Sequence, residues 1–148
     1  MSPQSRLTAG ILLVLMPAVV YGGTSILSLL VGDPAYAENQ LRQDLWRAGH
    51  AHAGVLLVLS LVTLRYVDEA MLPTGLRTVA RHAIPASAIL LPAAFFLSVL
   101  SPDATEPNAM IYLAYAGAVS LAAGLLILGF GLIRGYHDAE GPRKERNR

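Results

Sequence analysis

The segment Gly-His-Ala-His-Ala-Gly, residues 49–54, places two imidazoles, His50 and His52, at the start of an apolar run. Imidazole nitrogens bind metal ions and transfer protons near neutral pH. Side chains that ionise inside a bilayer are costly, so they are candidate functional groups by default. Trp46 and Arg47 directly precede the segment, and both residue types suit a membrane interface. The pattern predicts a site near one end of a membrane-spanning helix.

Residues two apart on an α-helix diverge by about 200°, because each residue turns the chain by ~100°. His50 and His52 therefore cannot hold one ion together from a regular helix. His52 shares its side of the helix with Gly49 and aliphatic residues, so we expect it to face an apolar cofactor pocket. His50 shares its side with Trp46 and Arg47, and we expect an interfacial or supporting position for it.

The ligand requirements of metals narrow the chemistry of such a site. Zinc and copper need two or three convergent protein ligands, and the remaining histidines, His82 and His137, are predicted on the opposite side of the membrane. The chain has no cysteine, which excludes thiolate ligands and disulfides. Heme needs only one proximal histidine. If a metal is bound, heme is favoured; a histidine that only hydrogen-bonds a neighbouring helix is the alternative.

The elements that must position these residues are membrane helices. Hydrophobic residues make up 54% of the chain and charged residues 14%, against roughly 25% charged in an ordinary soluble domain. Backbone groups in lipid must be paired within their own segment, which requires helices here. Four apolar stretches reach the ~20 residues needed to cross a bilayer. They span residues 8–31, 47–66, 79–100 and 109–133.

The sequence thus predicts an all-α integral membrane four-helix bundle, one transmembrane domain over residues 1–148, with a polar tail from 136 to 148. Most cations precede the first stretch, surround the second connection or follow the last stretch. The positive-inside rule then places both termini in the cytoplasm and the chain in the cell membrane. Arg42 and Arg47 are exceptions in a loop predicted to face outward, which suggests another task for them.

Smaller features refine this prediction. The string Ala35-Tyr36-Ala37 resembles a signal cleavage site, but the apolar core before it exceeds the ~7–15 residues of a signal, so we expect a retained helix. Small residues recur at spacing seven in the fourth stretch and predict close helix packing. They are Gly117, Gly124 and Gly131. Tyr21, Thr24, Ser25 and Ser28 share one side of the first helix and are expected to turn inward.

Trp46, Arg47, His52, Ala53 and Gly54 form a Trp-Arg…His-small-Gly pattern that resembles the second helix of styrene oxide isomerase. That family consists of four-helix membrane proteins that bind heme b and convert epoxides to carbonyl compounds. The likeness extends over most of the chain, including Ser101-Pro102 after the third helix and Pro107 before the fourth. Hydroxylaminobenzene mutase and the heme-copper oxidase core are more distantly similar.

The resemblance implies that heme b is bound with His52 as axial ligand of the iron, beside Gly49 and His50, and with Arg47, helped by Arg42, near the heme propionates. It implies an isomerase in which ferric heme acts as a Lewis acid on the oxygen of a small apolar epoxide. It also implies a homo-oligomer, in particular a trimer, in the lipid bilayer.

The chain departs from the family at the groups that position the substrate. Val58 stands where the family has asparagine, and Ser87 and Phe96 stand near the positions of its aspartate and tyrosine. Tyr112 and Tyr115, together with Ser87, are therefore secondary catalytic candidates. Two other functions stay open: a heme-free accessory or assembly subunit, and a heme electron carrier or sensor. No phosphate-binding loop is present, and the short basic tail, interrupted by Glu145, predicts no nucleic-acid partner.

Overall fold

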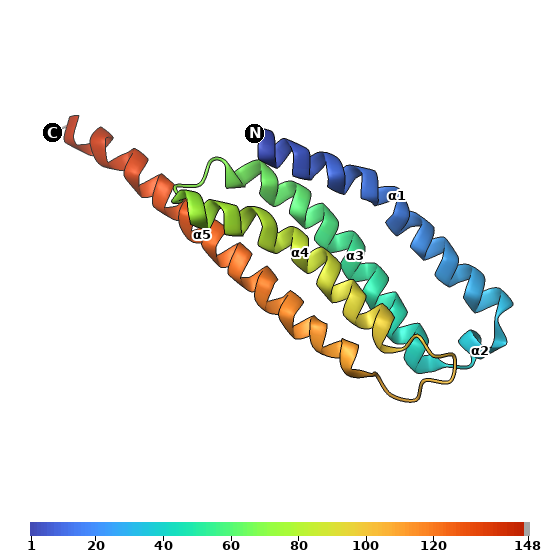
Figure 1. The fold of residues 1–148 in the computed structure, drawn as a ribbon. Coiled ribbons are helices and arrows are strands. Elements are labelled where there is room, and N and C mark those ends of the chain that lie inside the picture. Colours follow the sequence, from blue (N-terminus) through green and yellow to red (C-terminus); the bar gives the residue numbers. More distant parts are fainter. Residues whose placement is uncertain (147–148) are drawn as a thin grey trace.

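A computed structural model describes the backbone of residues 1–146 and the side chains of residues 1–136. The long helices lie side by side, joined by short connections (Figure 1). The elements are α1 (Pro3–Gly32), α2 (Pro34–Ala37), α3 (Gln40–Val67), α4 (Thr74–Ser98), η1 (Ala109–Tyr112) and α5 (Leu113–Arg146). Among the described residues, four helical segments are long and apolar enough to cross a membrane: Pro3–Gly32, Gln40–Val67, Thr74–Ser98 and Ala109–Tyr136. The predicted all-α bundle of four such helices is confirmed.

Helix α3 begins seven residues earlier than the predicted residue 47, at Gln40. The Asn39 side chain caps it by accepting a hydrogen bond from the Arg42 amide at 3.0 Å. The first two turns are polar but favour helix, so hydropathy alone does not detect them. As a result His50 and His52 lie closer to the middle of α3 than to its start. Helix α5 likewise continues into the predicted tail, as far as Arg146. The side chains of this tail after Tyr136 lie outside the described residues.

Close packing of α5 on α4 follows the predicted glycine spacing. A Cβ added at Gly124 would lie 2.7 Å from Ile84 Cγ1, and one at Gly117 would lie 2.8 Å from Leu91 Cγ. The Ser120 hydroxyl also donates to the Ala83 carbonyl at 2.8 Å. The glycines therefore let the two backbones approach, and the prediction of a small-residue interface is confirmed.

Helix α1 is the least enclosed element, since only 6% of its membrane-span window is buried. The expected inward polar side is wrong: Tyr21, Thr24 and Ser28 are exposed. The Thr24 and Ser25 hydroxyls donate to the Tyr21 carbonyl, both at 2.8 Å, so they are satisfied within the helix. The turn at Gly22 and Gly23 faces α3 instead.

The N-terminus, the α3–α4 connection and the C-terminal part of α5 share one end of the bundle (Figure 1). A buried polar network joins three helices there. Arg81 of α4 is paired with Asp68 at 3.0 Å and donates to the Ser5 hydroxyl at 3.0 Å. The Ser2 amide donates to Asp68 Oδ2 at 2.6 Å, and Arg81 also donates to Gln4 Oε1 at 2.9 Å. We call Ser2, Gln4, Ser5, Asp68 and Arg81 the basic-end network.

Burial of Asp68 opposes its ionisation, but the hydrogen bonds from Ser2, Arg81 and Ser5 outweigh this and lower the pKa of Asp68 to about 2. The carboxylate therefore stays charged and paired through the physiological pH range.

Candidate functional sites on two faces of helix α3

The two imidazoles leave α3 in different directions, as the helical geometry predicts. His50 packs against α1, where a Cβ added at Gly23 would lie 2.9 Å from both Nε2 and Cε1 of the ring. His52 is exposed on the side of α4, with its ring centroid 5.2 Å from that of Phe95. The expectation that His52 faces an apolar cofactor pocket stays a prediction: in one copy of the chain its side chain is exposed, and the cavity and groove described below adjoin His50.

Gly49 does not offer a flat surface to a cofactor. A Cβ added there would lie 3.0 Å from Phe96 Cε2 and 3.2 Å from Phe95 Cβ, so an α4 aromatic ring already covers the position. Trp46 Nε1 donates to the Phe96 carbonyl at 3.2 Å beside it. Gly49 instead allows α3 and α4 to approach each other, which corrects the expected contact between this glycine and a macrocycle.

Arg42 is a buried structural cation rather than a partner for a heme propionate. Its Nε donates to the Val99 carbonyl at 3.1 Å. Its guanidinium carbon lies 4.6 Å from the Trp46 ring centroid and 5.6 Å from that of Tyr36. These contacts join the start of α3 to the end of α4. They account for an arginine in the segment that was predicted to be an outward-facing loop.

The secondary catalytic candidates make local contacts. Ser87 is fully buried, and its hydroxyl donates to the Ile84 carbonyl at 2.6 Å. Tyr112 and Tyr115 are exposed and stack on each other with ring centroids 6.2 Å apart. None of these contacts joins a candidate hydroxyl to His52.

On its exposed face, His52 has a fixed orientation. Its Nδ1 lies 2.7 Å from the carbonyl oxygen of Ala48, one turn earlier. A carbonyl only accepts, so Nδ1 carries the proton, and Nε2 of the neutral ring keeps its lone pair. Such a hydrogen bond at one nitrogen is the usual support for a histidine that binds metal through the other. Small or aliphatic Ala48 and Val55 flank the ring along the helix.

The residues expected to surround a heme do not converge on this face. Arg47 and His50 line a cavity on the α1 side, and Gly49 is covered by α4. The free Nε2 of His52 is chemically suited to be an axial heme ligand, while the residues predicted to accompany it lie on other sides of α3. Within residues 1–136, no group of three or more His, Asp or Glu side chains could hold a metal ion by itself.

On the α1 side of α3, His50 adjoins two hollows. A partly open cavity of about 310 Å³ lies between α1, α2 and α3. It is lined by Gly23, Ile26, Leu27, Leu30, Tyr36, Arg47 and His50. A groove of about 590 Å³ runs between α1 and α4 over α3, with His50 and His82 both in its lining. We call these the polar cavity and the apolar groove.

Tyr36 is the residue that sequence reasoning missed. Tyr36 is 1% exposed, and its ring lies tilted against that of Trp46 with centroids 5.4 Å apart. Its buried hydroxyl has no hydrogen-bond partner among the described residues. The sequence offered only the Ala35-Tyr36-Ala37 string, which resembles a processing site. Asp33, which accepts from the Ala35 amide at 3.0 Å, starts the short helix that turns Tyr36 inward.

Comparison of the chain with protein-family models, with curated proteins and with solved structures gives no match.

Proposed function

We propose that this chain binds heme b through His52, on the membrane-exposed side of α3. The main support is the hydrogen bond between His52 Nδ1 and the Ala48 carbonyl at 2.7 Å. It leaves Nε2 available on an exposed surface. Away from the polar helix ends, an exposed imidazole has a high solvation cost in lipid, and coordination would offset it. The resemblance to styrene oxide isomerase points to the same residue.

The chain's own residues would contribute position and surroundings. His52 supplies the axial nitrogen, and the Phe95 ring at 5.2 Å restricts the rotation of the imidazole. One copy leaves this face open, so a bound macrocycle would be bounded by lipid or by another copy. A homo-oligomer, with a trimer implied by the resemblance, is part of the proposal.

The proposed activity is isomerisation of a small apolar epoxide to a carbonyl compound. Bound ferric heme would supply a Lewis acid for the epoxide oxygen. Val55 and Val58, both exposed on α3, would help to keep water from this face. The activity rests on the resemblance, whereas the heme proposal also rests on the geometry of His52.

We also propose that both termini are cytoplasmic in the cell membrane. Arg6, Arg65, Arg77, Arg81 and Arg134 all belong to helix segments at the bundle end that holds the N-terminus (Figure 1). The positive-inside rule supports this orientation.

The visible spectrum of the detergent-purified protein, expressed with added heme precursor, tests the heme proposal. We expect a Soret band in the parent, its loss in His52→Ala and its retention in the matched control His50→Ala. A colourless parent after reconstitution with heme would overturn the proposal and favour an accessory or assembly role. Loss of the band in His50→Ala alone would overturn the assignment to His52.

Epoxide turnover by the heme-loaded parent tests the activity separately. Styrene oxide is the first probe, with gas chromatography of the aldehyde as readout. Heme binding without turnover would leave the binding proposal intact and remove the isomerase activity, in favour of an electron carrier or sensor.

A further inference from the structure

The polar cavity on the α1 side of α3 contains polar groups that the fold leaves unused. The Tyr36 hydroxyl is buried without a partner, although buried hydroxyls in native proteins are almost always hydrogen-bonded. The His50 imidazole makes no hydrogen bond within the part of the chain whose side chains are described. Both side chains line the same cavity. An unpaired buried group that adjoins a cavity is expected to find its partner in that cavity, either an ordered water or a ligand.

The charge around this cavity favours an anion. Arg47 lines it and donates to Gln43 Oε1, which uses one of the five N–H donors of a guanidinium. Burial raises the pKa of Tyr36, while the nearby guanidiniums of Arg47 and Arg42 counteract the rise more than the Asp44 carboxylate adds to it. Asp44 is exposed and accepts from Gln40 Nε2 at 2.7 Å. The α2 and α3 residues of the cavity thus supply donors and positive charge, whereas its α1 wall is apolar.

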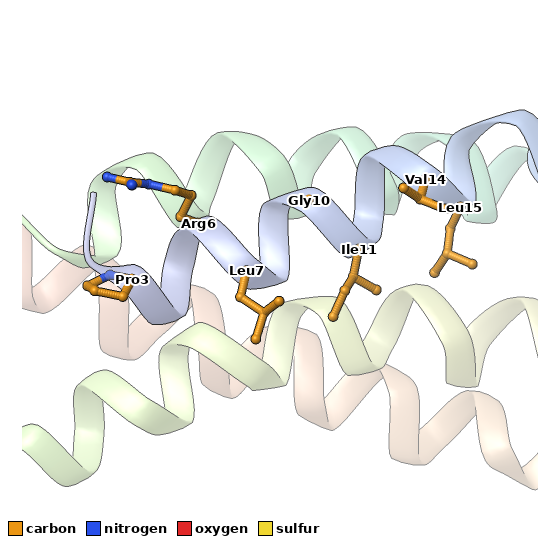
Figure 2. A pocket seen from close by; sticks show the side chains of 7 residues that line it. All are labelled: Pro3, Arg6, Leu7, Gly10, Ile11, Val14 and Leu15. Carbon is orange, nitrogen blue, oxygen red and sulfur yellow. The ribbon is translucent and has the colours of Figure 1, made fainter.

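The apolar groove continues from this polar cavity, because His50 lines both. Its α1 wall extends from Gly22 back to Thr8, a length of about 21 Å at ~1.5 Å per residue. Figure 2 shows an adjoining hollow on α1 with Leu7, Ile11 and Leu15 in a row, and of these Ile11 and Leu15 also line the apolar groove. One leaflet of a bilayer contributes about half of its ~30 Å hydrocarbon thickness, so the groove is long enough for one extended acyl chain.

We infer that the polar cavity binds the carboxylate of a long-chain fatty acid, with the acyl chain in the apolar groove. Arg47 pairs with the carboxylate, and Tyr36 and His50 donate hydrogen bonds to it. The volume of about 310 Å³ and the single groove suit a free acid better than a two-chain phospholipid with its headgroup. The site lies across α3 from His52 and is independent of whether His52 carries heme.

Binding of radiolabelled palmitate to the delipidated full chain in detergent, measured by scintillation proximity, tests the inference. Hexadecanol, which has the same chain and no charge, is the competitor that isolates the carboxylate. We expect palmitate to compete at least about tenfold better than hexadecanol, as a charge-assisted contact predicts. Equal competition by the two compounds would overturn the inference.

Variants assign the contacts. Arg47→Gln is expected to remove the preference for palmitate, and Tyr36→Phe to weaken palmitate binding several-fold without changing hexadecanol. Arg65→Gln, which alters an exposed arginine at the other end of α3, is the matched control and should bind as the parent does. Gel filtration and melting temperature verify that each variant is folded.

Two results would contradict the assignment. An undiminished preference for palmitate in folded Arg47→Gln would remove the proposed carboxylate partner. Displacement of palmitate by phosphatidylglycerol at equal concentration would show that the site accepts a phospholipid headgroup instead of a free acid.

Discussion

Two sets of polar groups, toward opposite ends of the bundle, differ in how far their hydrogen bonds are used. In the basic-end network, Arg81 and Asp68 use each other and three neighbouring residues as partners. In the second set, the buried Tyr36 hydroxyl, the half-buried His50 ring and Nε2 of the exposed His52 have no hydrogen-bond partner in the described part of the chain. The basic-end network stabilises the fold. The second set leaves donors and a lone pair free for ligands.

This difference has an energetic meaning. A buried ion pair that keeps all its hydrogen bonds is costly to break, because removing one partner leaves the other charge uncompensated. Removing a buried polar group that has no hydrogen-bond partner breaks no hydrogen bond, so it should not lower the free energy of unfolding. Substitutions at the two ends should therefore separate stability from ligand binding.

The largest expected effect is that of Arg81→Met. It leaves the Asp68 carboxylate without its cation and should lower the free energy of unfolding by about 3–5 kcal/mol. Denaturant titration in detergent measures this. Arg65→Met, which breaks the exposed pair with Glu69, is the control and should cost at most about 1 kcal/mol. Equal losses in the two variants would remove the distinction between the network and an ordinary surface pair.

The pH dependence of stability follows from Asp68. Its pKa is lower in the folded chain, about 2, than the usual 3.8 of a free aspartate side chain. The stabilisation is therefore complete above about pH 4 and is lost as the pH falls toward 2. Melting temperatures between pH 5 and pH 2 should fall in the parent and change less in Asp68→Asn. Parallel curves would contradict the role of this carboxylate.

A smaller effect distinguishes two hydroxyls. Ser5→Ala removes a hydroxyl that accepts from Arg81 and donates to Asp68, and should cost about 1 kcal/mol. Tyr36→Phe removes an unpaired buried hydroxyl and should be neutral or stabilising by up to about 1 kcal/mol. Both values come from the same unfolding experiment. A Tyr36→Phe loss as large as that of Ser5→Ala would mean that the tyrosine is already satisfied.

The smallest expected change in stability is that of Gly23→Ala. The new methyl would lie 2.9 Å from His50 Nε2, so the imidazole must shift, while alanine favours helix over glycine by up to about 1 kcal/mol. We expect an unchanged or slightly higher melting temperature together with weaker palmitate binding. Gly10→Ala, where a Cβ meets nothing within 4 Å, should leave binding unchanged. Equal palmitate binding by the two variants would show that His50 does not contact the ligand.

The sequence predicted the features that depend on local pattern. Hydropathy located four spans, and spacing seven identified Gly117, Gly124 and Gly131 as a packing face. Helical geometry also predicted that His50 and His52 diverge. These inferences need only the chain's own periodicity, which fixes angles within one helix.

The remaining features depend on where other helices lie. An angle of about 200° between two imidazoles does not say which one α1 will cover. The structure shows that α1 covers His50 and leaves His52 exposed. Gly49 was expected beneath a cofactor, yet it contacts Phe96 of α4. Tyr36 gave no usable signal, since its unpaired hydroxyl exists only once α2 folds against α3.

Chemical rescue tests most directly whether the free nitrogen of His52 binds the heme iron, as we propose. His52→Gly should abolish the Soret band, and added imidazole should restore it by occupying the vacated position. His50→Gly should keep the band without imidazole. A His52→Gly protein that retains the parent spectrum unaided, or a spectrum restored by imidazole only in His50→Gly, would contradict the claim.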